Sequence, residues 1–103
     1  MEASNPAAAI ALKVDDKDNV ATIFANGIRA GMSVEVRDKK GNCFTVKVLD
    51  NVPYGHKIAI RDIRSGEHIM KYGESIGAAS RDIPLGDYVH VHDMEALRGR
   101  GDL

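Results

Sequence analysis

Hydrophobic and polar residues alternate along most of this chain with a period close to two. Residues 10–14 and 20–24 are short apolar runs joined by the polar segment 15–19, a pattern that predicts a β-hairpin. Residues 34–48 predict a second hairpin, with its turn in the charged segment 38–42. Turn signals recur about every ten residues, which is typical of small barrels and sandwiches. The chain is therefore predicted to be all-β.

A short unit occurs four times in the second part of this pattern. It consists of an aliphatic anchor, two variable residues, a glycine, two more variable residues and an apolar strand. The anchors are Ile28, Val52, Ile63 and Ile83, and the glycines are Gly31, Gly55, Gly66 and Gly86. A tight turn that needs a positive φ costs glycine least, so a turn is predicted at each glycine. The anchor is expected to tuck beneath the strand that follows.

The second unit differs from the others in the residue that follows its glycine. The other three units have Met32, Glu67 or Asp87 there, whereas this one has His56, followed by Lys57. A histidine accepts or delivers a proton near pH 7, and an ammonium group can hold a carboxylate. Adjacent strand residues face opposite ways, so both can serve one site only if the turn after Gly55 re-aims them. The alternative is a polar turn with a solvated lysine.

Two further histidines are candidate metal ligands. His90 and His92 are two residues apart on a predicted strand, so they lie on one face with Cβ atoms roughly 6–7 Å apart. That spacing permits both to bind one ion, such as Fe(II), Mn(II) or Zn(II). Asp93, His56 or a partner would have to complete the ligand set. The alternative is the polar outer face of a strand.

Other polar residues favour structural roles or leave two roles open. Asp62 and Asp82 each precede an anchor, which indicates an Asx-type bond that holds the turn rather than catalysis. Tyr72 precedes Gly73, where a ligand or a backbone segment could approach closely. A packed tyrosine with a bonded hydroxyl is equally compatible with that sequence. His68 is predicted to be a surface residue.

Composition limits the function classes. The 103 residues carry 14 basic and 15 acidic side chains, a balance that favours neither nucleic acid nor an anionic membrane as partner. No segment approaches the roughly 20 apolar residues of a membrane span. The single Cys43 suits a reducing, cytoplasmic location and is predicted to be a small buried or half-buried side chain.

The two ends of the chain differ in character from the middle. Residues 1–9 are small and neutral and do not resemble a signal peptide, so they are predicted to be a disordered lead-in. Residues 10–94 form the predicted domain. Residues 95–103 are predicted to be a flexible, polar tail, in which Arg98 and Arg100 could dock a partner.

A long, ordered motif carries a family resemblance. It runs Gly55-His56-Lys57-Ile58-Ala59, Asp62-Ile63, Gly66, Ile69, Lys71-Tyr72-Gly73, Ile76-Gly77 and His90-Val91-His92. In these residues the chain resembles the SAF-type domain of the altronate/galactarate dehydratase family, over about residues 10–103. Residues 97–102 also look like the end of a stand-alone small subunit.

The resemblance implies a β-clip fold, which is an irregular set of short, folded-over strands. It also implies a small subunit that dehydrates a hydroxy sugar acid together with a separate large catalytic subunit. In that interpretation His56 transfers protons and Lys57 holds the substrate carboxylate, with Tyr72 and Gly73 near the substrate. His90 and His92 would contribute to an Fe²⁺ or Mn²⁺ site shared with the partner. Sulfolactate sulfo-lyase, whose small subunit has a similar pattern, is one alternative.

A second alternative is a non-catalytic β module that binds a sugar acid or positions a partner. Self-association of the chain is compatible with every one of these interpretations.

Overall fold

The computed structural model of this chain describes residues 10–90 and 94–95, all of which lie in strands, turns or loops. They form nine strands, in chain order β1 (Ile10–Lys13), β2 (Val20–Ile23), β3 (Ser33–Asp38), β4 (Cys43–Lys47), β5 (Lys57–Ala59), β6 (His68–Lys71), β7 (Glu74–Ala79), β8 (Tyr88–Val89) and β9 (Met94–Glu95). The prediction of an all-β fold is confirmed. The predictions for residues 1–9, 91–93 and 96–103 lie outside the described residues.

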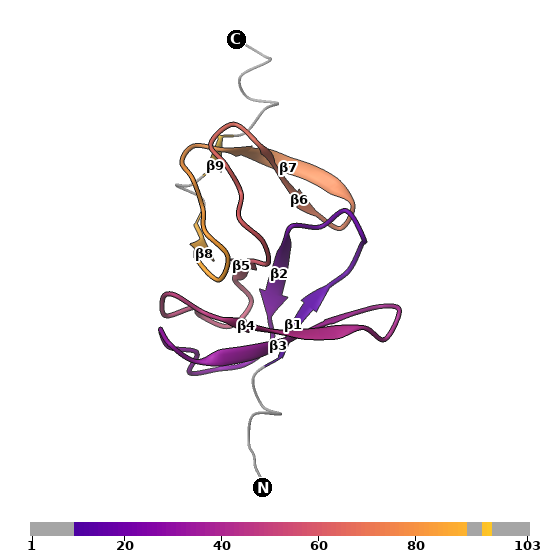
Figure 1. Cartoon of the computed structure of the whole chain (residues 1–103), viewed down its shortest axis with the longest axis vertical. Helices are drawn as coiled ribbons and strands as arrows, with labels where there is room; N and C mark the ends of the chain where they lie inside the picture. Colours follow the sequence, from indigo (N-terminus) through magenta and orange to yellow (C-terminus); the bar gives the residue numbers. More distant parts are fainter. Residues whose placement is uncertain (1–9, 91–93, 96–103) are drawn as a thin grey trace, which may run out of the picture.

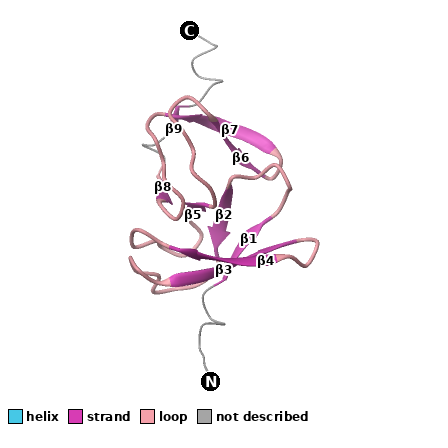
Figure 2. Ribbon diagram, in the orientation of Figure 1, coloured by secondary structure: helices cyan, strands magenta, loops and turns pink. Residues whose placement is uncertain are grey.

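The strands form two sheets (Figure 1). The larger sheet has the order β4-β3-β1-β2-β5-β8, and the smaller has the order β6-β7-β9. Both predicted hairpins are present, since β1 pairs with β2 and β3 with β4, each antiparallel. Figure 2 shows β3 and β4 at one end of the domain and β6, β7 and β9 at the other, with β2, β5 and β8 between them. None of the described residues belongs to a helix that could cross a membrane.

All four predicted glycine turns are present. Their glycines have φ values of 92°, 85°, 91° and 91°, for Gly31, Gly55, Gly66 and Gly86 in that order. In each turn the residue after the glycine donates its N–H to the carbonyl three residues earlier, at 2.9–3.1 Å. A glycine with positive φ at the third position of a four-residue turn is the arrangement of a type II turn. The sequence repeat is therefore a repeat of one turn geometry.

The four units associate in two pairs through their anchors. Ile28 bridges Val52, and Ile63 bridges Ile83, each antiparallel. All four anchors are at most 3% exposed. The aliphatic residue at the head of each unit thus packs against its counterpart in another unit.

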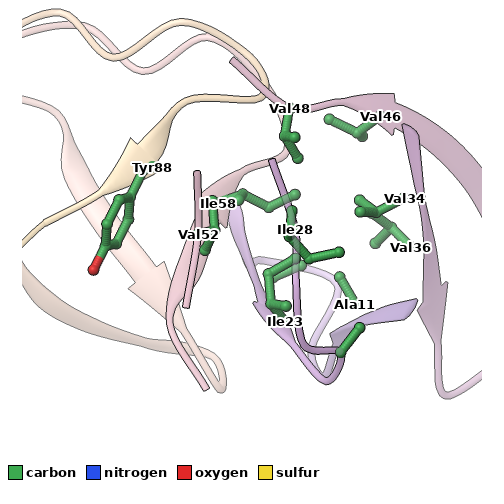
Figure 3. Packing of buried hydrophobic residues seen from close by; sticks show 12 residues of the cluster. Ala11, Ile23, Ile28, Val34, Val36, Val46, Val48, Val52, Ile58 and Tyr88 are labelled. Atoms are coloured by element: carbon green, nitrogen blue, oxygen red, sulfur yellow. The ribbon is translucent and has the colours of Figure 1, made fainter. Parts of the chain in front are cut away.

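Two buried clusters make up the core. The larger one, shown in Figure 3, combines side chains from β1 to β5 with Tyr88 of β8. The smaller one combines Val20, Ala59 and Val89 with aliphatic residues nearer the smaller sheet. Ile58 belongs to the first cluster and its neighbour Ala59 to the second. The strand β5 therefore separates the two clusters and sends alternate side chains to each.

A buried asparagine connects the two sheets. Asn19 is 0% exposed, its Oδ1 accepts the Met70 N–H at 2.8 Å, and its Nδ2 donates to the His68 carbonyl at 3.0 Å. The backbone N–H of Asn19 also donates to the Met70 carbonyl at 3.2 Å, so three hydrogen bonds join Asn19 to β6. Asn19 was not singled out in the sequence, because it looks like an ordinary turn residue there.

The prediction that Cys43 is buried or half-buried is wrong. Cys43 is a free, exposed thiol at the start of β4. It pairs with Arg37 at the edge of the larger sheet, and alternation along β4 turns Val46 rather than Cys43 toward the core. A hydrogen bond from the thiol to Glu35 raises the Cys43 pKa, which disfavours the thiolate.

Candidate functional site

His56 lies at the junction between a glycine turn and β5. The Gly55 N–H donates to the Ile23 carbonyl at 2.8 Å, and the Ile23 N–H donates to the His56 carbonyl at 2.8 Å. These two bonds attach the turn to β2 on both sides of Gly55. The backbone of His56 is thereby fixed while its side chain remains exposed.

The imidazole of His56 forms a hydrogen bond with a tyrosine from another strand. The Tyr88 hydroxyl oxygen lies 2.6 Å from His56 Nδ1, and the two rings meet edge to face at 83° with centroids 5.5 Å apart. Tyr88 is 8% exposed and packs into the larger cluster. Figure 3 shows its hydroxyl directed away from the aliphatic side chains. The buried ring therefore carries its polar end to the surface beside His56.

The ring of His90 also contacts this tyrosine. The centroids of the Tyr88 and His90 rings are 4.3 Å apart, with the ring planes at 39°. The register of β5 and β8 pairs Lys57 with Val89 and Ile58 with Tyr88. One step further along, this register sets His56 across from His90. Two imidazoles therefore contact one tyrosine ring, although 34 residues separate them in the chain.

Lys57 belongs to the opposite face of β5. Its pairing partners are Val89 and Thr22, both buried, and Val89 belongs to the smaller cluster. Burial of the side chain lowers the Lys57 pKa, and the nearby charge of Lys71 lowers it further. The structure thus groups His56 with Tyr88, and Lys57 with Lys71.

Tyr72 and Gly73 form the two-residue turn between β6 and β7. Both have positive φ, 57° and 78°, which is the backbone of a type I′ hairpin turn. The Lys71 ammonium lies over the Tyr72 ring, 4.9 Å from its centroid. Gly73 donates its N–H to Asp18 Oδ1 at 2.8 Å, and a side chain added at Gly73 would meet the Asp15 carboxylate at 2.9 Å. The close approach at Gly73 is therefore made by an aspartate of this chain.

The aspartates that precede the anchors bond to the paired unit. Asp62 Oδ1 accepts the Leu85 N–H, and Asp82 Oδ1 accepts the Ser65 N–H, both at 2.8 Å. These bonds span 23 and 17 residues, so each joins two turns and does not close its own turn as an Asx bond would. Both carboxylates also line a surface cavity of about 330 Å³ above the Ile63 bridge.

His68 is exposed, as expected, and its Nδ1 lies 2.9 Å from Ser75 Oγ. Within the described part of the chain no three histidine, cysteine or acidic side chains are grouped so as to hold a metal ion. The predicted ligands His92 and Asp93 lie outside that part. His56 and His90, which both contact the Tyr88 ring, are imidazoles that the described fold brings together.

Tyr88 is the site residue that the sequence analysis missed. Its position two residues before His90 predicts that both share a face of one strand. That signal links Tyr88 to His90 but not to His56. The contact with His56 depends on the pairing of β5 with β8, which the local pattern does not contain.

Comparison with known proteins identifies the family of this chain. Residues 9–97 match the altronate/galactarate dehydratase SAF domain. The (2R)-sulfolactate sulfo-lyase subunit alpha of Chromohalobacter salexigens is 35% identical over 86 residues, which cover 82% of this chain and 90% of that protein. Galactarate dehydratase (L-threo-forming) of Escherichia coli is 40% identical over 79 residues, 76% of this chain.

Altronate dehydratase of Escherichia coli is 38% identical over 82 residues, 80% of this chain. The chain spans only 14% and 15% of the lengths of these two dehydratases. The relatives are thus named as lyases, and the shared part is the SAF domain. This chain belongs to the altronate/galactarate dehydratase SAF-domain family.

Proposed function

We propose that this chain is the small subunit of a sugar-acid hydro-lyase and works with a separate large catalytic subunit in the cytoplasm. Two comparisons support a divided enzyme. The chain corresponds to about one seventh of each Escherichia coli dehydratase, whose remaining length would supply most of the catalytic machinery. A relative of nearly the same extent is named as a subunit alpha. The isolated chain is expected to be inactive.

The reaction would remove water from a hydroxy acid. A base takes the proton from the carbon next to the carboxylate, and an acid assists departure of the β-hydroxyl group. The observation that carries the proposal is the exposed imidazole of His56, held through Nδ1 by Tyr88. Its Nε2 then remains for proton transfer to or from a substrate.

Lys57 would bind the substrate carboxylate. A second ammonium nearby, that of Lys71, adds to the positive potential on that face of β5 and favours an anion. Tyr72 and Gly73 in the adjacent turn would border the same space. Because His56 and Lys57 face opposite ways, one substrate reaches both only around the end of β5 at the Gly55 turn. The large subunit would close over that end.

A divalent ion, Fe²⁺ or Mn²⁺, is the proposed cofactor, with His90 and His92 as ligands from this chain. Imidazole nitrogen suits both ions. When bound, such an ion stabilises the negative charge that develops on the substrate oxygens. The described residues hold no group of three ligands, so the remaining donors would come from Asp93 or from the large subunit.

The test is a reconstitution of the chain with a large dehydratase subunit from the same genome, assayed with altronate and galactarate. His56→Ala is expected to lower turnover by about 10²-fold or more, the usual contribution of a general acid or base. His68→Ala is the matched control, because His68 is also an exposed histidine one unit further along. Turnover that survives His56→Ala unchanged would refute the role of His56.

The second candidate is a sulfolactate sulfo-lyase subunit. The observation that favours it is the length of the match, since the alignment covers 90% of the Chromohalobacter protein. The same reconstituted pair, given (2R)-sulfolactate, would then release sulfite and leave the sugar acids untouched. If this chain has a non-catalytic role, His56→Ala would leave the turnover of the complex unchanged.

A further inference from the structure

We propose that Tyr88 is the positioning residue of His56: its phenol oxygen accepts the Nδ1 proton and so keeps the Nε2 lone pair available at the surface. The consequence for catalysis depends on the proposed function, but the hydrogen bond itself does not. The phenol is not proposed to touch the substrate.

Three features of the contact support this role. The oxygen–nitrogen distance is 2.6 Å, slightly shorter than the usual N–H···O range of about 2.7–3.2 Å, so the two groups are in close contact. Tyr88 is 8% exposed and belongs to the larger core cluster, so its ring has little freedom to follow a moving imidazole. The backbone of His56 is fixed to Ile23 by the bonds on both sides of Gly55. The backbone bonds to Ile23 and the side-chain bond to Tyr88 thus both restrain the position of the His56 ring.

A phenol suits a histidine that must change its charge. Neutral His56 with the proton on Nδ1 donates to the phenol oxygen, and the charged ring, protonated at Nε2 as well, keeps the same bond. The orientation of the ring therefore survives the gain and loss of the proton. A carboxylate in place of the phenol would stabilise the charged imidazole and so make release of its proton less favourable. The neutral partner leaves the proton free to move.

Two further ionisable residues lie beside the pair along its strands. The His90 ring contacts the Tyr88 ring, with centroids 4.3 Å apart. Lys57, the adjacent ionisable residue in the chain, belongs to the opposite face of β5. The phenol is therefore the polar group through which the described fold orients His56.

The test compares Tyr88→Phe with Tyr54→Phe in the isolated, ¹⁵N-labelled chain. Tyr54 is the matched control, because it lies two residues before His56, is 55% exposed and packs its ring against Phe24. Imidazole nitrogen shifts measured by NMR at alkaline pH report the neutral tautomer. Wild type and Tyr54→Phe are expected to hold His56 with the proton on Nδ1. Tyr88→Phe is expected to shift His56 toward the Nε2–H form that free histidine prefers.

A wild-type His56 that already shows the free-histidine mixture, or that is held as the Nε2–H form, overturns the proposal. So does a tautomer unchanged by Tyr88→Phe. If Tyr88→Phe disturbs the fold, as its backbone amide spectrum would reveal, the wild-type tautomer alone decides. In the reconstituted enzyme, Tyr88→Phe should lower kcat roughly 10-fold with little change in KM, as expected for the loss of one orienting hydrogen bond.

These results are separable from the test of the lyase. A fixed Nδ1–H tautomer combined with full turnover in His56→Ala would refute the proposed catalytic role of His56 and leave the hydrogen bond standing. A free tautomer combined with loss of turnover in His56→Ala would refute the role of Tyr88 and leave the lyase standing.

Discussion

His56 and Lys57 are neighbours in the chain but lie on opposite faces of β5. His56 shares a face with Tyr88, to which it is bonded at 2.6 Å, while Lys57 pairs with Val89 of the smaller cluster. The pair is therefore not a compact catalytic dyad. Among the described residues, the phenol of Tyr88 is the hydrogen-bond partner of the His56 imidazole.

Lys57→Met should stabilise the isolated domain near neutral pH. Burial and the charge of Lys71 hold the folded-state pKa of Lys57 below its unfolded value, so the unfolded chain binds this proton more tightly. The resulting penalty is complete below the folded pKa and fades as the pH rises toward the unfolded value of about 10.4. The gain from Lys57→Met in urea unfolding should therefore shrink between neutral and alkaline pH.

Lys39→Met is the control, since Lys39 is exposed in the turn between β3 and β4. Its effect on the free energy of unfolding should be small. A gain from Lys57→Met that is the same at all pH values would show that added apolar contact, and not removal of a buried charge, is responsible.

Gly86→Ala should destabilise the domain much more than Gly31→Ala. Both glycines have φ near +90°, so each substitution carries the strain of a left-handed backbone, about 1–2 kcal/mol. A Cβ at Gly86 would also lie 2.2 Å from the Lys47 carbonyl oxygen, whereas a Cβ at Gly31 would meet no atom within 4 Å apart from its chain neighbours. The total cost at Gly86 is therefore on the order of 3 kcal/mol or more. Equal urea midpoints for the two variants would contradict this packing.

Asn19→Ala should cost about 2–4 kcal/mol of stability. The substitution leaves the Met70 N–H and the His68 carbonyl without their amide partner, and each such group costs about 1–3 kcal/mol. Asn51→Ala is the comparison, because Asn51 is exposed and accepts one bond, from the Ala30 N–H. Its loss should cost about 1 kcal/mol or less. Urea unfolding of both variants measures the difference, and equal losses would mean that Asn19 does not join the sheets.

Asp62→Ala should weaken the domain by about 1 kcal/mol, because the Leu85 N–H loses its acceptor. Asp62→Asn keeps an acceptor oxygen and should recover most of that loss. The measurement is thermal unfolding of the chain alongside turnover of the reconstituted enzyme. A stable Asp62→Asn variant with strongly reduced turnover would move Asp62 from a structural role to a catalytic one.

Local pattern was sufficient for much of this protein. Period-two alternation predicted both hairpins, and the repeated anchor–glycine spacing predicted four turns because only glycine adopts φ near +90° without strain. The ordered motif that includes Gly55, His56 and Lys57 indicated the family. Cys43 shows the limit of such reasoning, since alternation gives two faces but does not say which one the core covers.

The sequence by itself determined the strands, the turns and the family, because each depends on residues close together in the chain. Only the tertiary structure decided that Tyr88 meets His56, that Lys57 turns away toward Lys71, and that Asn19 joins two sheets. These contacts span from 14 to 51 residues. They depend on which strands pair and in which register. The pairing and register are set by the need to bury both hydrophobic clusters in the same fold.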